Sequence, residues 1–113
     1  MPRLRHYKTV RYYETVFALK PTLSEEEMKK KFEEVKEFIK RKGGEILYEE
    51  DWGMKTLAYP IQKFNNARYY IVQFKTENPQ LPNELDFQLK IDDDVIRWLN
   101  FQIKEEQVKK HAQ

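Results

Sequence analysis

The sequence predicts an α+β domain, in which a four-stranded antiparallel sheet carries two helices on one of its faces. Three observations predict this fold class. The length of 113 residues suits one compact domain. Segments with strand-like alternation and segments with helical periodicity follow one another in the order strand, helix, strand, strand, helix, strand. Right-handed crossovers then place both helices on the same face, which is the ferredoxin-like split β-α-β arrangement.

The composition divides the chain into an arm, a domain and a tail. Residues 1–10 contain several cations, no acid and no clear period, and we expect a flexible basic arm there. The single domain is expected over residues 11–103. Residues 104–113 are polar, and we expect a frayed tail.

The first strand and the first helix are the first two elements. Residues 12–19 are rich in aromatic and β-branched side chains that alternate, which favours a strand. Ser24 is a suitable N-cap whose side chain can pair reciprocally with Glu27, and apolar residues then repeat at helical spacing. Gly43 suits the left-handed residue that ends a helix.

The rest of the domain contains three strands and a short helix. A long strand is expected over residues 45–59, with a bend at Gly53, because glycine inside a strand commonly marks a bulge. The elements expected after it are a hairpin loop at residues 63–67, a strand over 68–75, a helix containing Leu81, Leu85 and Leu89, an acidic turn at 92–94 and a strand over 95–103.

Strand parity predicts which side chains point away from the two helices. Several of them are apolar or aromatic, which is more than solvation requires, and exposed patches of this kind mark interaction sites. The residues expected on this open face are Glu14, Val16, Ala18, Tyr69, Ile71, Gln73, Trp98, Asn100 and Gln102.

The composition argues against an enzyme. The chain contains no cysteine, its two histidines are His6 and His111 in the terminal segments, and its one serine, Ser24, is explained by capping. The acids at 92–94 favour a solvated turn over a metal site, because consecutive carboxylates point in different directions. No apolar run approaches the roughly 18 residues of a membrane span. We expect a cytoplasmic protein with no catalytic residue, cofactor, metal, membrane or small-molecule substrate.

Basic residues beside aromatic ones remain as candidates for RNA binding through phosphate contacts and stacking. The third-strand pattern of the RNA-recognition motif matches only at Tyr69, Val72 and Phe74, and its glycines are missing. A net charge of +2 favours a local RNA-binding patch or a more basic partner. Ordinary surface charge explains any single candidate equally well. The candidates are Arg11, Tyr13, Lys55, Lys63, Arg68 and Arg97.

Six runs of sequence carry a resemblance to a known family. They are Arg11–Phe17, Lys20–Pro21, Gly43–Ile46, Glu50–Lys55, Leu57–Ile61 and Leu89–Arg97. In this order, and over residues 11–103, they resemble the family of the sixth protein of the bacterial small ribosomal subunit. Thr56 and Gln62 depart from the family pattern, which weakens the expectation of an RNA contact beside them.

The resemblance implies a structural protein of the ribosome, a ribonucleoprotein that carries out translation. It implies binding to 16S-type ribosomal RNA together with the eighteenth small-subunit protein. Carried over residue by residue, it implies that Arg11, Tyr13, Lys55 and Arg97 face the RNA.

The hypothesis for the protein-partner surface is the open face of the sheet, with Glu14, Tyr69, Ile71, Trp98 and Asn100. Two other functions are compatible with the same fold. One is a free-standing domain that binds single-stranded RNA, and the other is a domain that senses a small ligand.

Overall fold

The computed structural model describes residues 9–109. Residues 1–8 of the expected arm and residues 110–113 of the expected tail lie outside this range. The elements are β1 (Arg11–Leu19), α1 (Glu25–Arg41), β2 (Gly44–Ile61), β3 (Phe64–Thr76), α2 (Leu81–Lys90), β4 (Val95–Ile103) and the short 3-10 helix η1 (Glu105–Gln107).

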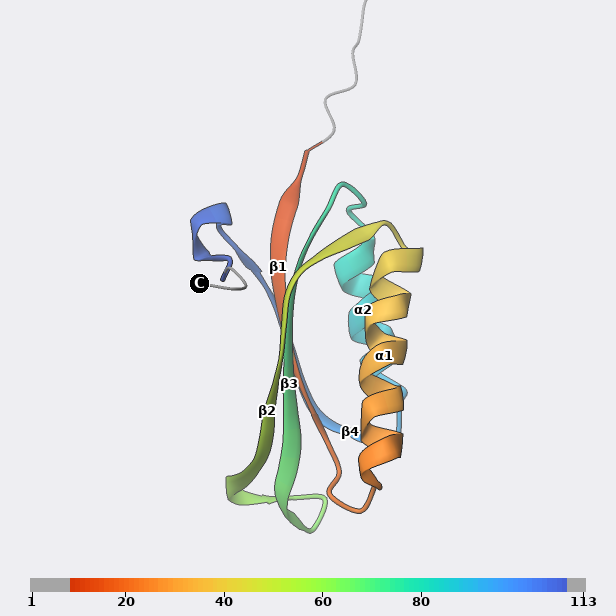
Figure 1. The fold of residues 1–113 in the computed structure, drawn as a ribbon, viewed down its shortest axis with the longest axis vertical. Helices are drawn as coiled ribbons and strands as arrows, with labels where there is room; N and C mark the ends of the chain where they lie inside the picture. The colour runs from red at the N-terminus through yellow and green to blue at the C-terminus, as the bar shows by residue number, and fades with distance from the viewer. Residues whose placement is uncertain (1–8, 110–113) are drawn as a thin grey trace, which may run out of the picture.

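The four strands form one antiparallel sheet in the order β2-β3-β1-β4. Both helices cover the same face of this sheet, and η1 is the only helix of residues 9–109 on the opposite side (Figure 1). The expected ferredoxin-like α+β fold is confirmed. We call the side without α1 and α2 the open face.

The main core lies between the sheet and the two helices. Phe17 of β1, Tyr70 of β3 and Phe32 of α1 form its centre, with ring centroids 5.5 Å apart for Phe17 and Tyr70 and 4.4 Å apart for Phe32 and Tyr70. Leu81, Leu85 and Leu89 of α2 are buried in the same cluster. Their four-residue spacing places one face of α2 on the sheet, as expected.

The ends of α1 follow the local sequence. The Ser24 hydroxyl accepts the Glu27 backbone N–H at 3.1 Å, and the Glu27 carboxylate accepts the Ser24 backbone N–H at 2.8 Å. Gly43, with φ of 95°, follows the last turn in the left-handed region, where a residue with Cβ is strained. The expected capping box and glycine stop are confirmed.

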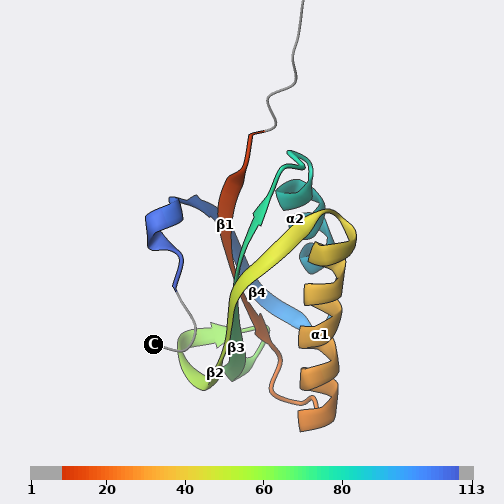
Figure 2. The ribbon, with the colours of Figure 1, turned by 45° about the horizontal axis from the view of Figure 1, so that its top comes forward.

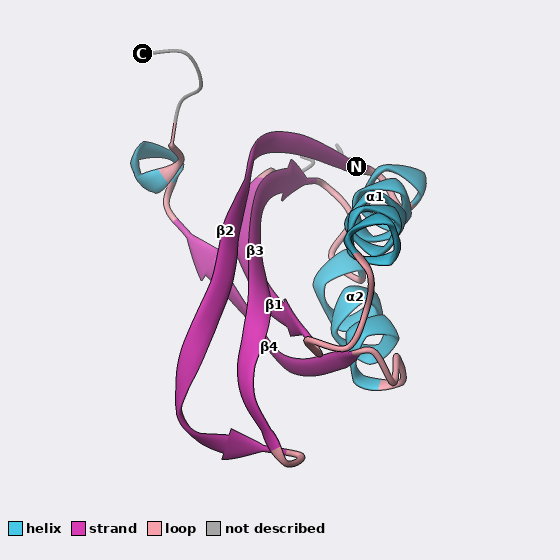
Figure 3. Ribbon diagram, turned by 60° about the horizontal axis from the view of Figure 1, so that its bottom comes forward, coloured by secondary structure: helices cyan, strands magenta, loops and turns pink. Residues whose placement is uncertain are grey.

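The second strand has two irregularities near the hairpin. At Gly53, with φ of 82°, its register against β3 shifts, and the Asp51 carboxylate accepts the Gly53 N–H at 2.8 Å. The expected bend is confirmed. Residues 57–60 then lie opposite Asn65 alone, because Thr56 pairs with Asn66 and Ile61 pairs with Phe64. The excess length makes the end of β2 turn sharply at the foot of the sheet (Figure 3).

The hairpin turn is shorter than the expected loop at 63–67. It consists of Gln62 and Lys63, with φ of 50° and 73°, and β3 begins directly after it at Phe64. Positive φ at both positions is what a two-residue type I′ turn requires, and this turn matches the twist of the strands. The expectation followed Asn65-Asn66, which instead lie within β3.

The segment after β4 folds back toward the sheet and is not frayed over residues 104–109. Figures 1 and 2 show η1, in dark blue, on the opposite side of the sheet from α1 and α2. The Lys109 backbone N–H donates to the Gln73 side-chain oxygen at 2.8 Å, and Gln73 on β3 is only 1% exposed. The segment therefore covers part of the open face.

Candidate RNA and protein interface on the open sheet face

The register of β4 corrects the expected composition of the open face. Trp98 pairs with Phe17 and Asn100 with Thr15, so both lie on the helix-covered face, as does Gln102 opposite Tyr13. The Trp98 indole N–H donates to Asp86 of α2 at 2.8 Å, and Asn100 accepts a hydrogen bond from the Thr15 hydroxyl. The expected placement of Trp98 and Asn100 on the open face is therefore wrong.

Leu99 and Phe101 of β4 take their place on the open face. Leu99 pairs with Val16 and Phe101 with Glu14, and paired residues of antiparallel strands share a face. Leu99 is 57% exposed and Phe101 is 39% exposed. The alternation of residues in the sequence did not identify them, because large apolar side chains occur at both the odd and the even positions of β4. Alternation alone therefore does not show which side of this strand faces the helices.

The C-terminal segment divides the open face into two parts. Beneath it, the Gln73 amide donates to Glu14 at 2.8 Å, and the Lys109 ammonium lies 5.5 Å from the centroid of the Tyr48 ring. Ile71 is on the open face as expected, but only 2% of it is exposed. This part of the face is already in contact with the protein's own chain.

The other part contains a cavity of about 230 Å³ beside the β2–β3 hairpin. Three aromatic side chains, Trp52, Tyr59 and Tyr69, line it together with the cations Lys55 and Arg97. We call this cavity, with these five residues, the hairpin hollow.

The sharp turn at the end of β2 builds the hairpin hollow. Leu57 and Ile61 pack against a small buried cluster of Ala18, Ala67 and Ile96 on the open face. Because two of these three side chains are alanines, the end of β2 can lie close to the sheet. Tyr59, between Leu57 and Ile61, remains 65% exposed. The packing therefore holds the hollow's aromatic rim next to Arg97 of β4.

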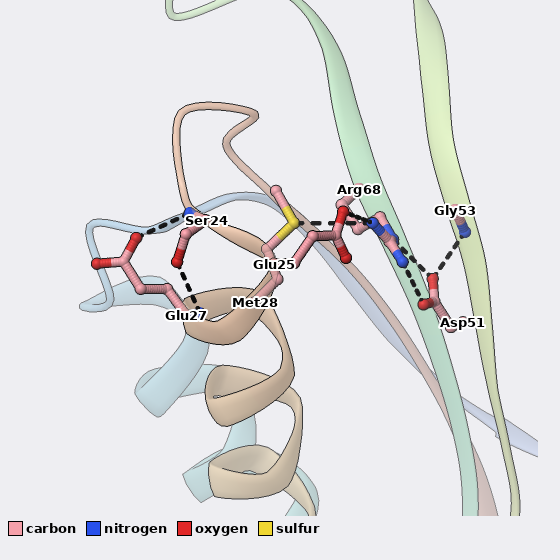
Figure 4. Close-up of polar contacts among 7 residues, drawn as sticks. All are labelled: Ser24, Glu25, Glu27, Met28, Asp51, Gly53 and Arg68. Carbon is pink, nitrogen blue, oxygen red and sulfur yellow. Dashed lines mark hydrogen bonds and ion pairs between the residues drawn. The ribbon is translucent and has the colours of Figure 1, made fainter.

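Arg68 lies on the helix-covered face, and two acids bind it (Figure 4). Its guanidinium donates to both oxygens of Asp51, at 2.8 and 2.6 Å, and to Glu25 of α1 at 3.0 Å. Hydrogen bonding from Arg68 lowers the pKa of Asp51, and Asp51 in turn raises the pKa of Arg68. The structure thus gives Arg68 a role in fastening β3 to β2 and α1, and does not bring it to the open face.

The remaining sequence candidates are dispersed. Arg11 is exposed at the start of β1, opposite Thr76, at the end of the sheet far from the hairpin. The Tyr13 ring stacks on Phe74 with centroids 5.6 Å apart and packs against the main core. Lys63 is exposed in the hairpin turn. Lys55 and Arg97 line the same cavity on the open face, and Arg68 lines a different cavity beside α1.

The described residues contain neither a metal-binding cluster nor a membrane-spanning helix. Within residues 9–109, no three His, Cys, Asp or Glu side chains are grouped as a metal ion would require. None of the helices in this part of the chain is long and apolar enough to cross a membrane.

Comparisons with known proteins agree with one another. The family model described as ribosomal protein S6 matches residues 12–102. The small ribosomal subunit protein bS6 of Aquifex aeolicus is 88% identical over 110 residues, which cover 97% of this chain and 100% of that protein. The protein of the same name from Nitratiruptor is 52% identical over 90 residues, covering 80% and 70%.

A solved structure shows the same fold. The crystal structure of the 30S ribosomal protein S6 from Thermotoga maritima has a TM-score of 0.82 and 32% identity, and the match covers 88% of this chain and 92% of that one. With the open sheet face and its basic, aromatic hollow, these similarities lead to one conclusion. The chain belongs to the ribosomal protein S6 family, a family of small-subunit ribosomal proteins.

Proposed function

We propose that this protein is a structural constituent of the small ribosomal subunit and binds its 16S-type RNA together with the eighteenth small-subunit protein. The observation that carries the proposal is the open face. A sheet side that neither α1 nor α2 covers presents unpaired cations beside aromatic rings, next to exposed apolar residues on an edge strand.

The charge distribution supports joint binding over binding by this chain alone. The net charge is +2, and the RNA-facing residues that we retain are Lys55, Lys63 and Arg97. Few cations neutralise few phosphates, and phosphate neutralisation supplies most of the sequence-independent affinity for RNA. A partner that adds its own contacts would therefore raise the affinity of the pair.

The exposed side chains of β4 support a protein contact. Leu99 and Phe101 present apolar surface on an edge strand, and apolar residues at the centre of a patch with a polar rim are typical of protein interfaces. We place the partner surface at Leu99 and Phe101. Glu14 lies directly opposite Phe101 but is hydrogen-bonded to Gln73 beneath the C-terminal segment, so it borders the proposed surface.

The test is binding of the purified full-length chain to small-subunit RNA with and without the eighteenth protein, at several salt concentrations. We expect weak binding alone and a gain of more than about 10-fold with the partner, equivalent to about 1.4 kcal/mol. Tight sequence-specific binding without the partner would instead identify a free-standing RNA-binding domain. A ligand-induced rise in melting temperature without RNA association would identify a small-ligand sensor.

A matched pair of variants locates the partner surface. Leu99→Ser changes the open face, and Ile91→Ser changes an equally exposed apolar residue after α2, with exposures of 57% and 55%. We expect only Leu99→Ser to reduce the gain that the partner produces. An equal loss in both variants would contradict the proposed surface.

A further inference from the structure

The hairpin hollow is a small, half-open depression in the open face. Its volume of about 230 Å³ is below the roughly 300–1,000 Å³ of pockets that enclose drug-sized ligands. Part of its wall is the end of β2, which is held against the sheet by Leu57 and Ile61. The hollow therefore exists before anything binds.

The rings of the hollow are available for stacking. Trp52 is 37% exposed and Tyr59 is 65% exposed, while Tyr69 is half-buried on the sheet. Elsewhere in the fold, aromatic rings such as Phe17 and Tyr70 stack on one another in the core. Aromatic faces left uncovered on a binding surface suit the faces of nucleobases, which every base presents.

The two cations of the hollow are also available. Lys55 and Arg97 are exposed, and neither has a carboxylate of the described range 9–109 within 4 Å. Hydrogen bonds lower the pKa of Glu50, and Lys55 is near enough to that carboxylate to contribute to the lowering, whereas no acid of this range is paired with Arg97. By contrast, the buried Lys36 on the other face contacts Glu33 and Glu49 at 2.9 and 2.6 Å. Unpaired cations at the rim of an aromatic cavity suit a ligand that joins a planar ring to an anion.

We propose that the hairpin hollow takes one unpaired nucleotide of ribosomal RNA, with its base against Trp52 and Tyr69 and its phosphate at Lys55 and Arg97. The inference rests on the proposed function and specifies the RNA contact. An apolar side chain of a protein partner fits the hollow less well, because it would cover Arg97 without supplying an anion, and a desolvated charge without a partner is costly.

The hollow should distinguish an unpaired nucleotide from a duplex, but should not distinguish one base from another. A duplex does not fit, because its bases are stacked on one another and their faces are not available. Stacking on aromatic rings tolerates any base. The RNA partner is therefore a looped-out or unpaired nucleotide, and its position in the RNA matters more than which base it carries.

The experiment uses the full-length chain with the eighteenth protein and small-subunit RNA, at one fixed salt concentration for the ring variants and at several salt concentrations for the charge variants. Trp52→Leu and Tyr69→Leu each remove a ring and keep an apolar side chain. We expect each to lower the RNA affinity about 10-fold, within the range measured for base stacking. Binding to the eighteenth protein in the absence of RNA should be unchanged. Arg97→Gln should reduce the slope of log affinity against log salt by about one. Lys30→Gln, on the exposed side of α1, removes the same charge as a control and should leave this slope unchanged.

Three results would overturn the inference. One is that neither Trp52→Leu nor Tyr69→Leu lowers the affinity of the protein for RNA. Another is a loss of binding to the eighteenth protein alone, which would show that a protein side chain fills the hollow. The third is an equal effect of Arg97→Gln and Lys30→Gln. If Tyr69→Leu does not fold, Trp52→Leu decides, because Trp52 lies outside both buried clusters. Failure of the parent protein to assemble with RNA and partner would instead refute the proposed function.

Discussion

The two faces of the sheet use the same residue types for different purposes. Arg68 on the helix-covered face has a side chain that is 17% exposed, and it contacts Asp51 and Glu25. Arg97 on the open face is exposed and pairs with no acid of residues 9–109. A cation whose donors are all engaged contributes to the fold, whereas one without a partner is available to another molecule. Counting basic residues in the sequence therefore overestimates the surface that is available for the proposed RNA binding.

The same contrast holds for apolar residues. Phe17 of β1 is fully buried between the sheet and the helices, whereas Leu99 of the neighbouring strand is 57% exposed. Burial of Phe17 stabilises the domain. Exposure of Leu99 contributes little to folding and leaves apolar surface for association. The helix-covered face thus supports the structure, and the part of the open face that the C-terminal segment leaves uncovered is available for association.

The largest expected effect is on folding. Phe17→Ala should lower the free energy of unfolding by about 3–5 kcal/mol, because it removes a large buried ring and leaves a cavity. Leu99→Ala should change it by less than about 0.5 kcal/mol. Urea denaturation of both variants measures the difference. A cost above about 2 kcal/mol for Leu99→Ala would show that the open face carries part of the core.

The arginine pair gives a smaller but more specific effect. Arg68→Gln should lower the free energy of unfolding by about 1–2 kcal/mol, because it leaves Asp51 without its bidentate partner and Glu25 unpaired. Its RNA affinity per folded molecule should not change. Arg97→Gln should do the opposite, with intact stability and weaker RNA binding. Denaturation and RNA titration on the same two variants test this reciprocity, and a loss of both properties in either variant would contradict it.

Acid stability should distinguish the faces in the same way. Hydrogen bonds from Arg68 lower the pKa of Asp51 below its unfolded value. This carboxylate therefore adds stability above the unfolded pKa, and the contribution is lost as the pH falls through the lowered folded pKa. Between about pH 5 and pH 2, Arg68→Gln should lose less stability than the parent protein, and Arg97→Gln should lose as much as the parent. Parallel curves for all three proteins would show that Asp51 is not held by Arg68.

The smallest expected effect is at the hairpin turn. Gln62→Asn and Lys63→Gly each place a residue suited to positive φ in the type I′ turn, and each should stabilise the domain by about 0.5–1 kcal/mol. Only Lys63→Gly removes a cation. If Lys63 contacts phosphate, that variant alone should bind RNA more weakly, despite its greater stability. Identical RNA affinities in the two variants would remove Lys63 from the interface.

Local signals in the sequence predicted most of the fold. The capping pair Ser24 and Glu27, the stop at Gly43 and the bend at Gly53 each depend on neighbouring residues, and each is confirmed. The hairpin turn was misplaced because Asn65-Asn66 carry a stronger turn signal than Gln62-Lys63. The parity of β4 was misassigned because both of its faces carry apolar residues, so only packing against α2 settles which face Trp98 takes.

The candidate interface was predicted less completely. Lys55 and Arg97 were identified separately, but nothing local indicates that the end of β2 folds over the open face and brings them to one cavity. The contact of Arg68 with Glu25 joins residues 43 positions apart, and that of Lys109 with Gln73 joins residues 36 positions apart. Such long-range contacts decide which cations and which parts of the sheet remain available, and no single sequence motif encodes them.

The most direct test of the difference between the two faces is hydroxyl-radical footprinting of this protein, free and assembled in the small subunit. Tyr59 and Leu99 on the open face are 65% and 57% exposed, and Phe87 and Ile91 on the helix layer are 56% and 55% exposed, so the two pairs start from similar accessibility. The account predicts that assembly protects Tyr59 and Leu99 from oxidation and leaves Phe87 and Ile91 reactive. Protection of Phe87 and Ile91, with Tyr59 and Leu99 still reactive, would contradict it.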